Sequence, residues 1–538
     1  MTVTPPPNDG PSAEPRVGPA APQRPELVRY GSALLSAVLP GLGHLAVGRV
    51  RRAGFFLLPV ILLVALLLIW IAGQPMIRSA AYLADPDVLG ALLVVQAGIL
   101  AWRLAAVALV IADGRFPRLG RRDALPVMML VAIVILPQAG VGYLTAVAQS
   151  AAAQVFQPST ADAGAPFPTF ADEGPSPGAS LEPSASPTAG PQRLTVLLLG
   201  VDSGPDRNTA LTDTMIVASL DRVTETVSMI SVPRDMVEVP LARGGVFHPK
   251  VNGLAAYVRW HPNEFPGYKG NGQAVLAGAL GKLLGVRIDY YAQVNLPGFV
   301  QVVNAVGGIT VDVDHGLCDA AYDEYGYEGS HFAIGAGRHK LNGNAALAYA
   351  RIRKSAGESD FTRAARQQQV LVALRDRIVK GGFLDDPVGL LRALGNTVET
   401  NVPPKLLPDL APLVTQISRK SVFQTVIKSP LVHPSYDARG SIQIPELARI
   451  KALGKQLFPA PGTPVKESFA APAPTKVASG PAGPAPVCYA PRPTAQPTPR
   501  PTAKPSVKPS ASSAPSSAPS STADPMPTDK PKGSPGPG

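Results

Sequence analysis

Cysteine and histidine are scarce in this chain of 538 residues, which contains two cysteines and seven histidines. Cys318 and Cys488 make neither a zinc-binding nor a thioredoxin spacing, and they allow at most one internal disulfide. His248, His261 and His331 are too scattered along the chain to form a metal site. The sequence therefore gives no sign of a zinc site or of a dithiol redox centre.

The pairing of the two cysteines has two alternatives. A disulfide would clamp the segment VCYAP, at 487–491, to a globular region. Alternatively Cys488 stays apart from Cys318, because the tail around it has the composition of a disordered segment. The sequence leaves this choice open.

Charged residues make up only 16% of the chain, with 49 basic and 38 acidic side chains and a net charge of +11. Many of the basic residues lie in loops between apolar segments or in a Pro-rich tail. Membrane topology and contact with a cell wall explain such a distribution as well as nucleic-acid binding does. We therefore expect no nucleic-acid partner.

The 60 prolines gather in segments that are too poor in large apolar residues to build a core. Residues 1–29 predict a disordered N-terminal tail without the apolar core and cleavage site of a signal peptide. Residues 149–191 predict a disordered linker, and residues 461–538 a Pro/Ser/Ala-rich disordered tail. Folded regions are thus expected at 30–148 and 192–460.

Long apolar runs fill the region 30–148 and predict a membrane region. Three runs, at 55–72, 88–112 and 125–148, are long enough to cross a bilayer as helices. The earlier segment 30–48 is interrupted by proline and glycine, so a fourth span, a re-entrant segment and an interfacial helix are alternatives. We favour three spans.

The loops of this region indicate its orientation. Segments 48–54 and 113–123 are strongly basic, and the loop at 74–87 is not, which predicts that the first two lie in the cytoplasm. The span at 125–148 then runs outward. We expect a multi-pass cell-membrane protein whose large domain is extracytoplasmic.

The region 192–460 alternates β-type and helical patterns, which predicts an α/β or an α/β/α layered domain. The expected strands are TVLLLGV, MIVASL, TVSMISV, YYAQV and GITVDV. The expected helices are GQAVLAGALGKLLG, LPGFVQVVNAVG, NGNAALAYAR and DFTRAARQQQVLVALRDRIV.

Three charged side chains are expected at one rim of this sheet. Asp202 directly follows the strand TVLLLGV, where ligands of α/β sheets usually bind, although a turn or capping role is the alternative. MIVASL and TVSMISV form a predicted hairpin, which places Asp213 beside Arg234. Asp202 joins them if its strand runs parallel to TVSMISV. Two carboxylates without histidine or cysteine suit Mg²⁺, with Mn²⁺ as the alternative.

A second cluster is basic and lies in ALAYARIRKSAGESDFTRAARQQQ, residues 346–369. Asp360 is expected to cap a helix on which Arg363, Arg366 and Gln367 point the same way. Guanidinium groups bind phosphate in a planar, bidentate way, and together with a metal they describe a pyrophosphate site. A solvated basic face is the alternative reading of such a cluster.

The stretch between these helices carries two more arginines. Arg351 and Arg353 share a face if the chain there is extended. Lys354 and Glu358 are expected to belong to a solvated loop.

These motifs, in their order along 193–380, resemble those of the LytR-CpsA-Psr family of extracytoplasmic domains. The motifs are LLLGVD, LTDTMIVASLD, SMISVPRDMVEV, PKVNGLAAY, VNLPGFVQVVNAVGGITVDV, HKLNGNAALAYARIRK and DFTRAARQQQVL. The resemblance implies a phosphotransferase that moves an envelope glycopolymer from a polyprenyl-pyrophosphate carrier to peptidoglycan, forming a phosphodiester link. It also implies a three-layer α/β/α fold with an apolar pocket for the polyprenyl chain. The lipid bilayer, the carrier-linked glycan and peptidoglycan are the implied partners.

The resemblance assigns roles to individual residues. Asp202 and Asp213 match the magnesium-associated aspartates. The implied pyrophosphate contacts are Arg207, Arg234, Lys250, Arg351, Arg353, Arg363, Arg366 and Gln367. Arg234, Asp360 and Arg363 are the residues to which we assign catalysis, with Asp235 as a second candidate for proton removal. The segment 255–273 is longer and more aromatic than in the family, and the N-terminal region has more apolar segments than the single helix that is commonest there.

The walls of the lipid pocket are expected in the apolar runs AVLAGALGKLLG and FVQVVNAVG, whose alternative is an ordinary role as helices that cover the sheet. Two other functions stay open. A hydrolase would split the lipid-linked pyrophosphate with the same residues and no acceptor. A non-catalytic envelope regulator is the second alternative.

Overall fold

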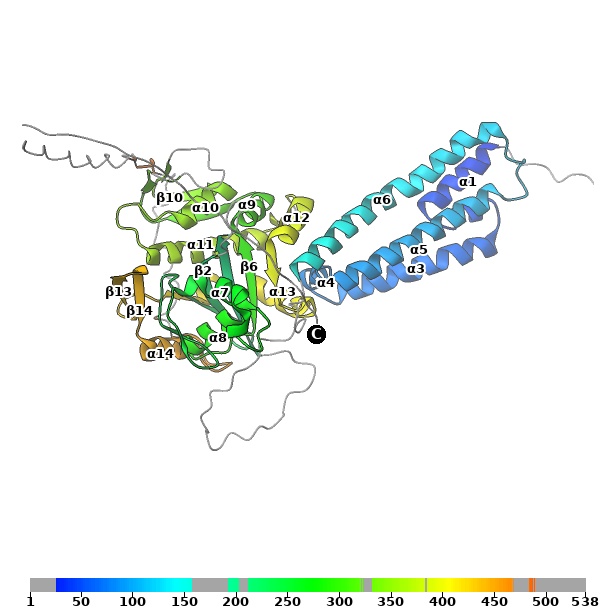
Figure 1. Ribbon diagram of the computed structural model, residues 1–538. Helices are drawn as coiled ribbons and strands as arrows, with labels where there is room; N and C mark the ends of the chain where they lie inside the picture. Colours follow the sequence, from blue (N-terminus) through cyan, green and yellow to red (C-terminus); the bar gives the residue numbers. More distant parts are fainter. Residues whose placement is uncertain are drawn as a thin grey trace, which may run out of the picture. The chain divides into compact units, whose positions relative to one another are not determined.

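The computed structural model describes residues 26–156, 192–202, 211–320, 322, 331–382, 385–466, 468, 483–486 and 488. Most of the predicted tails at 1–29 and 461–538, and of the linker at 149–191, lies outside the described residues. Figure 1 shows the N-terminal helices in blue and cyan and the α/β domain in green to orange.

Three N-terminal helices coincide with the predicted spans. They are α3 (Val50–Ala72), α5 (Pro86–Ile111) and α6 (Ala124–Val155), separated by the short helix α4 (Met76–Tyr82) and a 3-10 turn at Arg121–Asp123. By length and composition, each of the three is sufficient to cross a membrane. The aromatic rings of Phe56 and Trp102, 4.9 Å apart, join α3 to α5.

The doubtful segment 30–48 is not one continuous helix. It is divided between α1 (Glu26–Val38) and α2 (Leu42–Ala46), and Gly41 between them has φ +104°, a conformation that favours glycine. Neither helix approaches the roughly 20 residues that a span requires. Apolar side chains of α1, such as Ala33 and Ala37, pack instead in one buried cluster with Val107 and Val134 of the long helices.

A mixed six-stranded sheet is the centre of the α/β domain, in the order β11-β6-β1-β2-β3-β12. Its strands are β1 (Arg193–Asp202), β2 (Leu211–Asp221), β3 (Thr226–Ser231), β6 (Tyr290–Asn295), β11 (Val398–Thr400) and β12 (Val422–Val426). β2 lies antiparallel to both β1 and β3, so β1 and β3 run in the same direction. The predicted hairpin is therefore confirmed, and the condition for Asp202 to lie at the same rim, a first strand parallel to TVSMISV, is met.

Both edges of the sheet come from residues beyond 387. β11 pairs antiparallel with β6, and β12 pairs parallel with β3. The helices of this last region are α12 (Pro387–Thr397), α13 (Leu407–Gln416) and α14 (Leu447–Leu457). The segment from 387 to 457 is thus an integral part of the domain.

Alternate residues of the central strands enter different cores, as the two-residue period of a strand requires. Leu197 and Leu199 of β1 pack in one cluster with α7 (Leu254–Trp260), α8 (Gly272–Leu284) and α14. Leu198, between them, packs in a second cluster with Ile216 of β2 and Leu371 of α11 (Asp360–Val379). The structure confirms a mixed α/β fold with a central sheet.

A third core lies around α9 (Leu296–Ala305) and α10 (Gly343–Arg351). It includes the predicted strand GITVDV as β7 (Ile309–Val313), which pairs with β10 (Gly337–Leu341) outside the central sheet. The other two-stranded sheets are β4 (Val239–Pro240) with β5 (Val246–Phe247), β8 (Leu317–Asp319) with β9 (Phe332–Ile334), and β13 (Val432–Asp437) with β14 (Gly440–Pro445).

Side-chain caps fix where the helices near the cavity begin. Asn295 caps α9, Asn342 caps α10 and Ser359 caps α11, each accepting a hydrogen bond from a backbone N–H of the first turn. The expectation that Asp360 caps α11 is therefore wrong by one residue. Ser359 and Thr362 form a reciprocal capping box, and this leaves the carboxylate of Asp360 available to other partners.

Cys318 of β8 and Cys488 form a disulfide, with their Cα atoms 5.6 Å apart. Of the two alternatives that the sequence leaves open for these cysteines, the structure therefore shows the disulfide. The bond fastens part of the C-terminal region to the α/β domain.

Candidate active site in a cavity with a basic end

Asp202 lies at the rim of the sheet, directly after an irregularity in the pairing of β1 with β2. Asp202 is the last residue of β1, and the register with β2 shifts between Gly200 and Val201. A Cβ atom at Gly200 would lie 2.9 Å from the Cβ of Thr214, so only glycine fits this close approach. Asp213 follows as the third residue of β2.

Arg234 meets Asp213 as the hairpin geometry predicts. Its Nη1 lies 2.8 Å from the Oδ1 of Asp213, and its Nε lies 3.7 Å from the carboxylate of Asp235. Burial alone would lower the pKa of Arg234, but the carboxylates of Asp213, Asp235 and Asp360 together raise the pKa above its usual value. Arg234 is thus a permanent cation at the rim.

Arg351 connects the two metal-candidate aspartates. It is the last residue of α10, and its Nη2 lies 3.6 Å from Asp202 and 4.0 Å from Asp213. Both carboxylates therefore face one cation, which places them close together. Two adjacent carboxylates fit the usual protein share of a magnesium shell, which phosphate oxygens and water complete. Within the described residues, no group of three or more acidic, histidine or cysteine side chains offers a fuller metal site.

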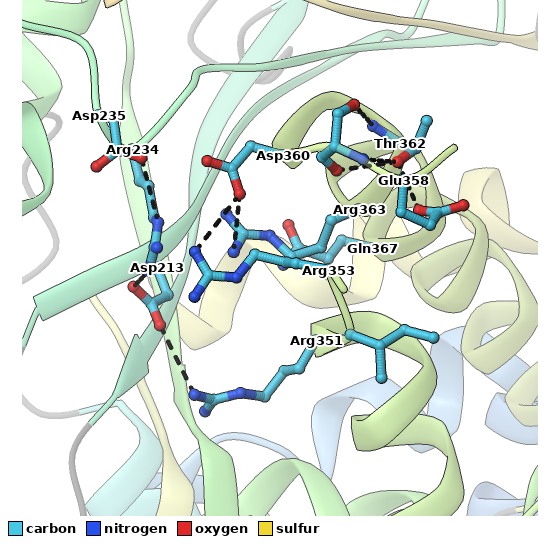
Figure 2. Close-up of polar contacts among 12 residues, drawn as sticks. Asp213, Arg234, Asp235, Arg351, Arg353, Glu358, Asp360, Thr362, Arg363 and Gln367 are labelled. Carbon is cyan, nitrogen blue, oxygen red and sulfur yellow. Dashed lines mark hydrogen bonds and ion pairs between the residues drawn. The ribbon is translucent and has the colours of Figure 1, made fainter. Parts of the chain in front are cut away.

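Asp360 lies among the remaining arginines. Its carboxylate is 3.4 Å from Arg363 and 3.7 Å from Arg353, and Figure 2 shows both guanidinium groups directed toward it. Burial would raise the pKa of Asp360, but Arg363 and then Arg234 lower it below its ordinary value. Burial lowers the pKa of Arg363 to about 10, against the opposing effect of Asp360.

Arg366 departs from the prediction. It does not lie with Arg363 and Gln367 but inside the domain, where its Nη2 is 2.9 Å from Glu358 and donates to the carbonyl of Ile352. Its side chain is 8% exposed, and its guanidinium also lies over the ring of Tyr349. The helical period alone placed Arg366 with Arg363 and Gln367, but its partners Glu358 and Ile352 hold it away from the cavity.

Glu358 is that acid, and the expectation that it lies in a solvated loop is wrong. Its side chain is 2% exposed, and it also accepts a hydrogen bond from the hydroxyl of Thr362. Lys354 lies in the loop and is exposed, as expected, and it also lines the cavity. The sequence offered no partner for Glu358, because Arg366 lies two turns away across a helix start.

Lys250 also has a local partner. Its ammonium group is 3.0 Å from Asp235, and this contact links the PKVN segment to the rim beside Arg234. Arg207 lies outside the described residues.

The charged residues surround one end of a cavity of about 390 Å³. Five basic side chains line it, namely Arg234, Arg351, Arg353, Lys354 and Arg363, together with Asp213, Asp319 and Gln367. The rest of the lining is largely apolar. It comes from β1, β2, β6, α9, α10, α11 and α12, with Leu198, Ile216, Val294, Phe299, Val302, Leu347, Val370, Leu371, Leu374 and Leu394 among its side chains.

The two helices predicted as pocket walls differ in outcome. Phe299 and Val302 of α9 line the cavity, as expected. None of the residues of α8, all of which the structure describes, does so. Leu280 and Leu283 of α8 are buried in the core on the other face of the sheet. Apolar periodicity identified both helices as buried, but it carries no information about which face of the sheet each one covers.

The strand contribution to the cavity was not predicted. Leu198 and Ile216 project from the face that carries α11, whereas their neighbours Leu197 and Met215 enter the other core. The alternation of the strands would have misled here. Asp213 and Met215 lie two residues apart in β2, yet Asp213 lines the cavity and Met215 enters the other core, because the register shift between Gly200 and Val201 falls opposite Asp213.

Comparison with known proteins relates this chain to one family. The LytR_cpsA_psr family matches residues 171–453. A "Polyisoprenyl-teichoic acid--peptidoglycan teichoic acid transferase TagU" of Halalkalibacterium halodurans is 29% identical over 209 residues, which are 39% of this chain and 61% of that protein. The protein TagV of Bacillus subtilis, which carries the same transferase name, is 32% identical over 210 residues, 39% of this chain and 50% of that protein.

Among solved structures, the crystal structure of Bacillus subtilis TagV is 26% identical and aligns with a TM-score of 0.38, covering 49% of this chain and 97% of that one. The chain spans between about half and three fifths of the length of the curated relatives named above.

Proposed function

Because this chain belongs to the LytR-CpsA-Psr family, we propose that it is a membrane-anchored phosphotransferase that moves an envelope glycopolymer from a polyprenyl-pyrophosphate carrier to peptidoglycan. The observation that carries the proposal is the single cavity with five basic side chains at one end and an apolar lining beyond them. A ligand complementary to it has a polyanionic head and a hydrocarbon chain. The relatives named as teichoic acid transferases support the same class of reaction.

The arginines would bind the pyrophosphate. Arg234, Arg351 and Arg363 have side chains that are at most 18% exposed, so their charge is weakly screened by water. Guanidinium groups can grip phosphate oxygens in pairs, and this geometry orients the head as well as holding it. Arg353 is 46% exposed and stands at the more open side of the cluster.

Asp202 and Asp213 would hold Mg²⁺, or Mn²⁺ in its place. Both offer only oxygen ligands and both already face a cation, Arg351. When bound, the metal would supply charge neutralisation on the phosphate oxygens.

In the reaction, an acceptor hydroxyl of peptidoglycan would attack the phosphorus that bears the sugar. A new P–O bond forms to the acceptor, the bond to polyprenyl phosphate breaks, and the acceptor proton passes to a carboxylate. Asp360 and Asp235 are the carboxylates at hand, and both lie beside Arg234. The low pKa of Asp360 makes it a weak base, which is adequate because a loose transition state needs little activation of the nucleophile.

We assign the domain the three-layer α/β/α arrangement expected from the sequence, because helices contribute to cores on both faces of the sheet. The three long apolar helices would anchor it as a multi-pass protein. The basic segments 48–54 and 113–123 would then lie in the cytoplasm and the α/β domain outside the cell, where its acceptor is.

Arg234→Ala tests the proposal in the purified full-length protein. We expect loss of transfer of a labelled, polyprenyl-pyrophosphate-linked glycan to peptidoglycan, with the domain still folded. Arg439→Ala is the matched control, because Arg439 forms exposed ion pairs with Asp437 and Glu238 and does not line the cavity. Transfer at the wild-type rate by the Arg234 variant would refute the assignment. Release of free glycan phosphate at the same rate with and without peptidoglycan would instead identify a hydrolase.

A further inference from the structure

The end of α10 and the chain that leads from it to α11 carry three of the five basic residues of the cavity, Arg351, Arg353 and Lys354. We call residues 351–358 the arginine loop. Beyond Arg351, which ends α10, this loop contains no helix or strand, so no ladder of backbone hydrogen bonds fixes Arg353 and Lys354. Its position depends on a few specific contacts, and these contacts decide how well the phosphate-binding groups are held.

The first contact lies within the segment itself. Arg366 of α11 pairs with Glu358 at one end of the arginine loop and donates to the carbonyl of Ile352 near the other end. One guanidinium thus ties together the two ends of the loop. This contact holds the ends, but it leaves the middle of the loop to other partners.

The second contact reaches the middle of the arginine loop from β8. The backbone N–H of Cys318 donates to the Oγ of Ser355 at 3.0 Å, and Ser355 is 9% exposed. His315, just before β8, lies 3.3 Å from Glu358. Asp319, just after Cys318, lines the cavity. β8 therefore contacts both the arginine loop and the cavity.

β8 itself is weakly held by its own sheet. It has three residues and, within the part of the chain that the structure describes, pairs only with the three residues of β9. Cys318, at its centre, is bonded to Cys488, which belongs to a segment 170 residues later in the chain. The disulfide is thus placed on the residue that donates to Ser355.

The C-terminal segment is seated along β8 and β9 by more than the disulfide. The backbone N–H of Gly483 donates to the carbonyl of Ala336 at 2.8 Å. A Cβ atom at Gly335 would lie 2.0 Å from the carbonyl oxygen of Gly483, and one at Gly316 would lie 3.2 Å from Pro486. The two glycines leave the space that residues 483–486 occupy. We call residues 483–488 the strap, of which the structure describes all but 487.

We propose that the strap, through the Cys318–Cys488 disulfide and the Ser355 hydrogen bond, is a positioning element of the active site that holds the arginine loop against the cavity. This inference rests on the proposed function, because it assigns the strap a role in pyrophosphate binding. Outside the cytoplasm the disulfide would persist, so the strap would be a fixed part of the mature domain.

The test is a comparison of two ligands with the full-length protein in detergent. Geranylgeranyl pyrophosphate carries an anionic head and an apolar chain, and geranylgeraniol carries the chain alone. In Cys488→Ser and in Ser355→Ala, we expect the Kd of the pyrophosphate to rise between about twofold and tenfold, the range for one lost hydrogen bond. The Kd of the alcohol should stay unchanged, because the apolar lining is not altered.

The chain provides its own control, since Cys318 and Cys488 are its only cysteines. Dithiothreitol should reproduce the weaker pyrophosphate binding in the wild type and have no further effect on Cys488→Ser. If the disulfide acts through Ser355, the double variant Ser355→Ala/Cys488→Ser should bind no more weakly than the weaker single variant.

Three results would overturn the inference. Unchanged pyrophosphate binding in Cys488→Ser would show that the strap positions nothing. An equal loss for the pyrophosphate and the alcohol would show a general structural role. If the wild type binds both ligands equally, the proposed function fails and this inference fails with it. If the wild type prefers the pyrophosphate and Cys488→Ser shows the same preference undiminished, the inference alone fails.

Discussion

Substitution of Arg366 separates two roles for this residue, a phosphate contact as the motif implies or an internal anchor as the structure shows. The Arg366 side chain is 8% exposed and that of its partner Glu358 is 2% exposed. Arg366→Met keeps much of the volume but leaves a buried carboxylate without its cation. Removing one partner of a buried ion pair costs about 3 to 5 kcal/mol. Glu358 keeps its hydrogen bond from Thr362, so we expect the lower end, about 3 kcal/mol.

The expected loss is large enough to measure by pulse proteolysis of the full-length protein in urea. With an m-value of about 3 kcal/mol/M, the urea midpoint of the α/β domain should fall by about 1 M. The double variant Glu358→Gln/Arg366→Met should recover more than half of this loss, because no buried charge is then left unpaired.

The reasoning would be refuted if Arg366→Met unfolded at the wild-type urea concentration and yet no longer bound geranylgeranyl pyrophosphate. That result would mean that Arg366 contacts the phosphate and that the buried pair with Glu358 contributes little. The lower pKa that burial gives Arg366 agrees with an internal position but does not decide between the two roles.

Two further predictions concern the cavity. Leu371→Trp should fill part of the apolar lining and weaken binding of geranylgeranyl pyrophosphate by about tenfold or more, while the short-chain isopentenyl pyrophosphate binds as before. Ile444→Trp, at a residue that is 40% exposed, is the control. An equal loss of binding for both ligands in Leu371→Trp would contradict the prediction. Asp360 has a lowered pKa in the folded protein, so it contributes stability above its ordinary value of 3.8 and loses it as the pH falls through the folded value. The urea midpoint of Asp360→Asn should therefore depend less on pH below 3.8 than that of the wild type, and parallel pH profiles would count against this assignment.

The polar rim was predictable because it depends on local rules. The hairpin of β2 and β3 has a short polar connection, and antiparallel pairing then places Asp213 beside Arg234. Likewise the helices α10 and α11 begin at side-chain caps within one residue of their expected starts. Such features need only the sequence of one or two neighbouring elements.

The errors, and the one choice that the sequence leaves open, concern contacts that reach beyond a single helix or strand. The sequence indicated a phosphate contact for Arg366 and a solvated position for Glu358. In the structure the two side chains form a buried ion pair with each other. α8 looked like a pocket wall because its apolar pattern does not say which face of the sheet it covers. The choice for Cys318 depended on a segment 170 residues away. Periodicity and caps report structure within one element, and each of these three facts depends on a contact outside it.

The two short edge strands have a consequence for the solubility of shortened forms of this protein. The motifs that resemble the family end near residue 380, yet β11 and β12, at Val398–Thr400 and Val422–Val426, cover the outer sides of β6 and β3. A fragment that stops at 380 would lack β11 and β12, and it would leave β6 and β3 with unpaired backbone N–H and C=O groups along their outer sides. Such open edges pair readily with other chains, so the fragment would tend to self-associate through its sheet. The strands β11 and β12, which lie outside the recognisable motifs, thus protect the domain from aggregation.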